Sequence, residues 1–229
     1  MLQNYFWLYG GLIVIGGIGL GWLCCLYSSV YVKREAAWKD GTAGMMPHCR
    51  LVQLISILLL FSLLLRFDWN WQLGKFMVLS FLLLVIGVID YYSFLIPDSL
   101  LLLGLLLYVP LSLVNGQAMP DLLLQGLLGG CAGALPLLAF ILAADTLLQQ
   151  ETMGGGDIKL FFLLGVYMGP SRVFLILFLS CLIGLFWQLL RQSLRRGTLF
   201  PFGPSIAAAA WLVLLWGEQL LDWYWNFLL

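Results

Sequence analysis

Long apolar stretches, most of them near the length that crosses a lipid bilayer, occupy most of this 229-residue chain. A helix that spans the hydrocarbon core needs about 20 apolar residues. Only 10% of the residues are charged, whereas soluble domains carry about 25%. The sequence therefore predicts an all-α polytopic membrane protein, and we expect residues 1–229 to form a single integral membrane domain.

We expect about eight transmembrane helices, two of them short. The first span is rich in glycine, which suits close packing between helices. Polar loops are expected at residues 28–50, 145–157 and 191–203. The predicted spans are residues 5–27, 51–65, 76–96, 99–115, 122–144, 158–169 and 173–190, and a last span that begins near Pro204 and fades into an aromatic tail, Trp223-Tyr224-Trp225.

The Lys and Arg residues indicate the orientation in the membrane, because loops rich in them stay in the cytoplasm. If the loops alternate between the two sides, one side receives only Arg66, Lys75 and Arg172, which leaves eight of the 11 Lys and Arg residues on the other side. The richer side is predicted to be cytoplasmic, with both termini on the non-cytoplasmic side. The net charge is zero, which argues against a nucleic-acid partner.

Two aspartates are expected to meet at the cytoplasmic face. Asp90 lies in the third predicted span, seven residues before Pro97 and so roughly 10 Å inside the helix end, and Asp157 lies at the start of the sixth. Two carboxyl groups in contact do not both ionise easily, so one keeps a proton, as in aspartic proteases. The ionised group takes a proton from water and the neutral one polarises the scissile carbonyl.

Three glycines, Gly154, Gly155 and Gly156, directly precede Asp157. Glycine lets another backbone come close, so this run is predicted to admit an extended peptide substrate beside the two carboxyl groups. Structural alternatives remain open at this point. The glycines could form a loose first turn of a helix, Asp157 could cap that helix, and Asp90 could pair with a structural polar group.

The cysteine and histidine pattern does not predict a metal site. The chain has five cysteines and one histidine, and no two cysteines have the C-x-x-C spacing of a structural zinc site. Pro47-His48-Cys49 is expected to lie in a loop. The cysteines of the apolar segments are expected to be small packing residues.

The two aspartate segments resemble the motifs of type IV prepilin peptidases. Residues 90–98 resemble the first motif, an aspartate followed at fixed spacing by an apolar residue, Pro97 and Asp98. Residues 154–159 resemble the second motif, G-x-G-D with a following lysine, Lys159, which presenilin-type intramembrane proteases share more loosely. Residues 200–204 resemble the late Pro-Phe-Gly-Pro turn of the family, and the segment around Glu35 resembles its N-terminal loop.

The resemblance implies a membrane-embedded aspartic endopeptidase that cleaves the basic leader of prepilins or pseudopilins at the cytoplasmic face of the bacterial inner membrane. It implies that Asp90 and Asp157 are the catalytic pair and that the peptidase needs no cofactor. The expected partners are the substrate and membrane lipid. Residues that match the family's motifs are expected to shape the substrate site: Gly154, Gly155, Gly156, Pro97, Asp98 and Lys159.

Several of these positions also have ordinary structural explanations. Asp98 could cap the fourth helix, and Lys159 could extend to the interface as an anchor. Asp145 and Glu151 in the expected loop before the glycines could attract a basic leader, or could simply be solvated.

The first cytoplasmic loop departs from the family pattern. Many members carry two C-x-x-C pairs there, associated with a zinc-bound module and with N-methylation of the new pilin N-terminus. Here residues 28–50 are short and contain only Cys49. We therefore expect no zinc, and S-adenosylmethionine is expected as a cofactor only if methylation is retained. The alternatives are a proton- or ion-coupled transporter that uses both aspartates, and a non-catalytic assembly paralogue.

Overall fold

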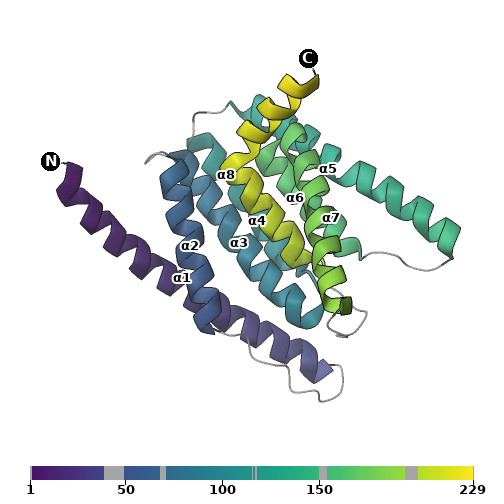
Figure 1. The fold of residues 1–229 in the computed structure, drawn as a ribbon, viewed down its shortest axis with the longest axis horizontal. Coiled ribbons are helices and arrows are strands. Elements are labelled where there is room, and N and C mark those ends of the chain that lie inside the picture. The colour runs from purple at the N-terminus through teal and green to yellow at the C-terminus, as the bar shows by residue number, and fades with distance from the viewer. Residues whose placement is uncertain are drawn as a thin grey trace.

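Eight α-helices and no strands make up the described part of the chain, which confirms the predicted all-α class (Figure 1). The computed structural model describes residues 2–38, 49–67, 71–114, 116, 118–149, 154–193 and 201–228. The helices are α1 (Leu2–Trp38), α2 (Cys49–Arg66), α3 (Trp71–Ser93), α4 (Asp98–Val114), α5 (Met119–Leu148), α6 (Gly155–Met168), α7 (Pro170–Ser193) and α8 (Gly203–Leu228).

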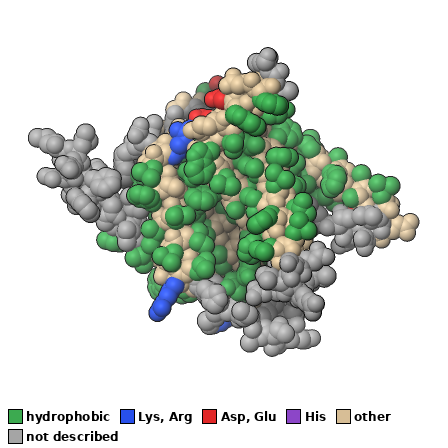
Figure 2. Space-filling view, viewed as in Figure 1, with side chains coloured by type: hydrophobic (Ala, Val, Ile, Leu, Met, Phe, Trp, Pro, Cys, Tyr) green, Lys and Arg blue, Asp and Glu red, His purple; other side chains and the backbone are tan. Residues whose placement is uncertain are grey.

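Six helices are long and apolar enough to cross a membrane, namely α1, α2, α3, α5, α7 and α8. Their outward faces carry large exposed hydrophobic side chains, as expected of surfaces in contact with lipid. Figure 2 shows a face that is mostly hydrophobic, with charged side chains near its two ends. The chain is therefore a multi-pass membrane protein.

The two short helices lie within this bundle. α4 has 17 residues and α6 has 14. α6 packs against α4, α5 and α7, and its residues 163–168 are all buried. The run of apolar residues in α6 thus lies at the centre of the hydrophobic core. The sequence predicted that the second and sixth spans would be short. The sixth is short, but α2 has 18 residues, and the other short helix is α4.

The predicted loops are shorter than expected because several helices extend into them. α1 continues to Trp38, so the prediction of a loop was wrong for residues 28–38, and residues 39–48 lie outside the described part. α5 continues to Leu148 and therefore includes Asp145. The aromatic residues near the C-terminus belong to α8 rather than to a fading tail. Polar side chains on the extended ends had suggested loops, yet these segments keep helical backbone bonds.

α3 ends at Ser93, three residues earlier than predicted. Phe94 has φ 55°, in the left-handed region that ends many helices, and its N–H donates to the carbonyl of Asp90 at 2.9 Å. Asp90 therefore lies in the last turn of α3. The expected depth of roughly 10 Å was wrong, because it assumed a helix that reached Pro97.

Glycines allow two helix pairs to approach closely. In α1, a Cβ at Gly17 or Gly21 would lie 2.7 Å from atoms of Ile57 or Gln53 in α2. In α5, a Cβ at Gly129 would collide with the backbone carbonyl of Gly165 in α6. The expectation that the glycine-rich first span packs closely against another helix is confirmed.

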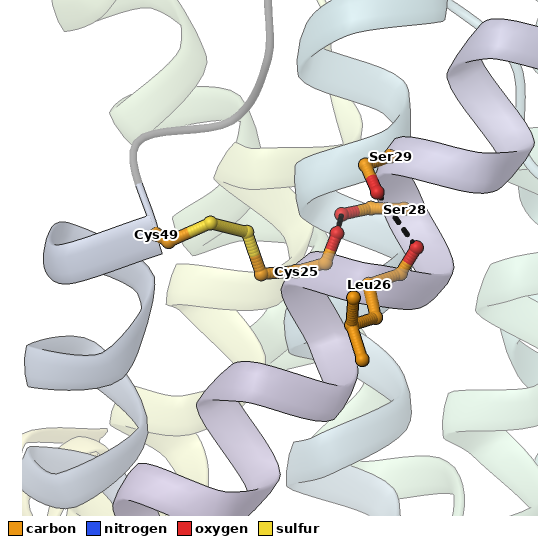
Figure 3. Close-up of a disulfide and its surroundings, with 5 residues drawn as sticks. All are labelled: Cys25, Leu26, Ser28, Ser29 and Cys49. Carbon is orange, nitrogen blue, oxygen red and sulfur yellow. Dashed lines mark hydrogen bonds between the residues drawn. A yellow bond between two sulfur atoms is a disulfide. The ribbon is translucent and has the colours of Figure 1, made fainter.

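A disulfide joins α1 to the first residue of α2 (Figure 3). Cys25 and Cys49 have their Cα atoms 5.7 Å apart, and the hydroxyl of Ser28 donates to the carbonyl of Cys25 at 3.2 Å. The predictions that Cys25 is only a packing residue and that Cys49 lies in a loop were wrong. Cys24, which directly precedes Cys25, is buried with a free thiol.

Candidate active site

Asp90 lies in the last turn of α3 and is only 6% exposed. Its Oδ2 atom accepts a hydrogen bond of 2.8 Å from the backbone N–H of Gly203, the first residue of α8. The N-terminal end of a helix carries unpaired N–H groups and a partial positive charge, both of which favour an anion. The start of α8 therefore provides a hydrogen-bond donor for the carboxyl group of Asp90.

Gly203 has to be glycine for this contact to form. A Cβ at this position would lie 2.7 Å from Oδ2 and 2.9 Å from Cβ of Asp90. Sequence reasoning noted the motif around Gly203 only as a resemblance and assigned it no role. The signal was a glycine at the start of an apolar helix, but its partner lies 113 residues away in the chain.

Asp157 is the third residue of α6. The helix begins at Gly155, Gly154 occupies the N-cap position, and the N–H of Asp157 donates to the carbonyl of Gly154 at 3.2 Å. The alternative that Asp157 caps the helix is therefore wrong. Asp157 lies outside the six helices that are long enough to span the membrane.

The carboxyl groups of Asp90 and Asp157 lie within electrostatic reach of each other. Burial raises the pKa of Asp157 from its ordinary value to about 7, and the negative charge of Asp90 adds to this rise. A carboxyl group that accepts an N–H bond, beside a second that keeps its proton near neutral pH, is an arrangement that can perform general acid and base chemistry.

The three glycines before Asp157 differ in their surroundings. A Cβ at Gly156 would lie 3.0 Å from the Cβ of Ile96, in the segment between α3 and α4, so packing requires glycine there. A Cβ at Gly154 would meet only Asp157 Oδ2, at 4.0 Å, and one at Gly155 would meet nothing within 4 Å. The backbone at these two positions is therefore accessible to another molecule.

Asp98 and Lys159 form an ion pair that joins α4 to α6. The Nζ atom of Lys159 lies 2.8 Å from each carboxylate oxygen of Asp98, although both side chains are more than half exposed. Such exposed pairs contribute at most about 1 kcal/mol, so the pair aligns the two helices more than it stabilises them. This contact was not predicted.

Pro97 is buried, and its carbonyl accepts the N–H of Leu100 at 3.1 Å. Pro97 therefore occupies the N-cap position of α4, and Asp98 is the first helical residue. The alternative of Asp98 as the helix cap is wrong. Lys159 bonds to Asp98 rather than extending alone to the interface.

Several other predicted positions cannot be placed. Glu151, His48 and Phe200 lie outside the described residues, as does the side chain of Glu35. Within the described ranges, no group of three or more His, Cys, Asp or Glu residues is arranged to hold a metal ion.

The fold and the site together define a multi-pass helical membrane protein with two acidic side chains at one end of its bundle. Comparison with known proteins narrows this class. Residues 77–189 match the type IV leader peptidase family. This segment contains both aspartates, and its match to the type IV leader peptidase family confirms the resemblance drawn from the motifs.

Curated relatives are similar over a larger part of the chain. The prepilin leader peptidase/N-methyltransferase of Stutzerimonas stutzeri is 36% identical over 165 residues, covering 71% of this chain and 56% of the relative. Those of Aeromonas hydrophila and Bacillus subtilis (strain 168) are 34% and 32% identical, covering 76% and 69% of this chain and 60% and 62% of each relative. The chain thus spans about three-fifths of the length of these relatives. No solved structure matches significantly.

Proposed function

We propose that this chain is a membrane-embedded aspartic endopeptidase that removes the leader of prepilins or pseudopilins. The observation that carries the proposal is the pair of the buried Asp90 and the half-buried Asp157, inside the segment that matches the leader peptidase family. The open backbone of Gly154 and Gly155 gives an extended peptide room to lie beside the pair.

The two aspartates take different roles in this proposal. Asp90 is the general base, because the N–H of Gly203 and the N-terminus of α8 favour its ionised form. Asp157 is the general acid, because burial and the charge of Asp90 keep its proton in place near neutral pH.

The reaction then runs as follows. Asp90 takes a proton from a water molecule as the water oxygen bonds to the scissile carbonyl carbon, while Asp157 donates its proton to the carbonyl oxygen. The resulting diol breaks its carbon–nitrogen bond as Asp90 passes its proton to the leaving amine. Asp157 recovers a proton from the diol hydroxyl, which restores both starting states.

We place the protein in the bacterial inner membrane with the aspartates toward the cytoplasm. Two features support this orientation: the excess of Lys and Arg residues toward that side in the sequence, and the position of both carboxyl groups at one end of the bundle. Figure 1 is consistent with it, since both termini lie toward the upper side of the view while α3 ends and α8 begins toward the lower side.

Cleavage of a purified prepilin by the reconstituted protein tests the proposal. Asp90→Asn and Asp157→Asn should each lower the rate at least about 100-fold, because each removes one proton-transfer group without changing its size. Asp121→Asn, at an exposed position in the first turn of α5, is the control and should cleave at the wild-type rate.

Near-normal cleavage by either variant, with the protein present at its usual level in the membrane, would exclude the catalytic pair. A transporter or a non-catalytic assembly subunit would leave the prepilin uncut even by the wild type. Mass spectrometry of the new N-terminus, with and without S-adenosylmethionine, tests N-methylation separately from cleavage.

A further inference from the structure

A hydrophobic groove lies between α2, α3 and α8, with Trp187 of α7 at its side. The cavity has a volume of about 560 Å³, and its walls are almost entirely apolar. α2, α7 and α8 lie on the face that is turned toward the viewer in Figure 2, where hydrophobic side chains dominate. The groove therefore faces the surroundings that an apolar partner would come from.

One end of this groove adjoins the candidate catalytic base. Gly87 and Tyr91, on either side of Asp90 in α3, both line it. So does Pro204, which follows the Gly203 whose N–H bonds to Asp90. The lining continues along α3 as far as Ser80, ten residues and roughly 15 Å from Asp90. The groove thus runs from the site into the apolar part of the bundle.

Ser80 gives this groove an unusual polar feature. Its side chain is 5% exposed and lines the cavity, and its hydroxyl has no hydrogen-bond partner within the described part of the chain. A buried hydroxyl without a partner is unfavourable, so most are bonded. An occupant with a polar atom at this depth would satisfy it.

We infer that this groove binds the membrane-embedded helix of the peptide substrate, which enters beside α2 and α3 and presents its end to Asp90. The inference rests on the proposed function. Inside a bilayer a peptide has to be helical, because every backbone group must find its partner within the segment. An apolar helix face fits the walls, and a small polar residue or a carbonyl on it meets Ser80. The groove is then the part of the site that selects substrates by their membrane segment.

Photo-crosslinking tests the occupant without requiring catalysis. A benzophenone amino acid is placed at Leu58, which lines the groove, in an Asp157→Asn background with a prepilin that the wild type cleaves. The matched control position is Leu128 on α5, since these two leucines are 54% and 56% exposed. The prepilin should crosslink from position 58 and not from 128. Crosslinks to lipid alone at position 58, or equal crosslinking at both positions, overturn the inference.

A filled groove provides a second, kinetic test. Ala208→Trp places a large side chain in the groove, and Ala139→Trp places one on the exposed face of α5 as the control. We expect Ala208→Trp to raise KM for the full prepilin at least tenfold, and Ser80→Ala to raise it severalfold. Cleavage of a short soluble peptide that spans only the cleavage site should stay unchanged in Ala208→Trp and in Ser80→Ala.

The outcomes separate this inference from the proposed function. If the wild type cleaves neither substrate, the proposed function fails. If the wild type cleaves both and Ala208→Trp affects both equally or neither, the protease stands and the groove inference is overturned.

Discussion

Gly203 holds the carboxylate of Asp90 through its backbone N–H, and the absence of a side chain lets the two groups meet. Gly203→Ala should lower the cleavage rate about 100-fold, because a Cβ there pushes Asp90 away from its position and small displacements of reacting groups have large effects. The measurement is the rate of prepilin cleavage by protein in proteoliposomes.

Gly74→Ala is the matched control for this substitution, since a Cβ at Gly74 in α3 meets nothing within 4 Å. It should leave the rate unchanged. Full activity of Gly203→Ala would show that the contact between α8 and Asp90 has no part in catalysis.

The raised pKa of Asp157 predicts a pH dependence of stability. In the unfolded chain this carboxyl group loses its proton near its ordinary pKa of 3.8, whereas in the folded protein it keeps the proton up to about pH 7. The folded state therefore binds more protons between these values, and its stability falls as the pH rises from about 4 to 7. Above pH 7 Asp157 is ionised in both the folded and the unfolded state, and the loss of stability that its charge causes no longer changes with pH.

Asp157→Asn removes this loss of stability, because asparagine does not ionise. Its melting temperature in detergent should exceed that of the wild type by roughly 10 °C at pH 8, and the difference should shrink as the pH falls toward 4. Asp121→Asn, at an exposed position, should follow the wild type at every pH. A constant difference between Asp157→Asn and the wild type would argue against a raised pKa.

At the scale of the helices, the contact between α5 and α6 fixes the position of Asp157. The backbones of the two helices meet at Gly129 and Gly165, where neither position has room for a Cβ. Gly129→Ala should destabilise the protein by about 1–3 kcal/mol, since an inserted methyl group forces the helices apart. Thermal unfolding in detergent measures the change, and cleavage should decrease along with it.

Gly19→Ala in α1 is the control, because a Cβ at Gly19 meets nothing within 4 Å. Alanine favours a helix more than glycine does, so this variant should be as stable as the wild type or slightly more stable. Equal melting temperatures for Gly129→Ala and the wild type would contradict the close contact.

The sequence was sufficient to predict the helices but not their ends. The long apolar stretches identified every helix, because composition and length determine which segments cross a membrane. The end of α3 depended on a left-handed Phe94, and residues 28–38 stayed helical despite their polar character. Such ends are decided by local backbone bonds and by packing against neighbouring helices, neither of which appears in a hydropathy pattern.

The candidate site was predictable to the same limited degree. The glycine run and the proline after Asp90 marked the two segments that carry the carboxyl groups. The contact of Gly203 with Asp90 and the ion pair of Asp98 with Lys159 join residues 113 and 61 positions apart. These contacts depend on how the helices are arranged, so local spacing carries no signal for them. The disulfide was missed for the same reason.

At the scale of the whole molecule, the disulfide provides a test of orientation. Cys49 begins α2, next to Arg50, at the end of the bundle that we propose to be cytoplasmic. Disulfides rarely persist in a reducing cytosol. We therefore expect Cys25 and Cys49 to be thiols in growing cells and to form the bond only on oxidation.

Alkylation with a mass tag after rapid acid quenching measures the redox state of this pair. The assay uses a variant in which the other three cysteines, Cys24, Cys131 and Cys181, are replaced by serine. A fully formed disulfide in growing cells would contradict the proposed orientation and would place this end of the bundle outside the cytoplasm.

The shortness of α6 has a consequence for the supply of water to the reaction. Its 14 residues extend roughly 21 Å, less than the ~30 Å of hydrocarbon in a typical bilayer. Residues 163–168 of α6 are buried in the core, so we expect its first turn, which carries Asp157, to lie inside the lipid boundary on its own side of the membrane. We expect solvent to reach Asp157 from that side only, so that the proposed hydrolysis needs no pore through the membrane.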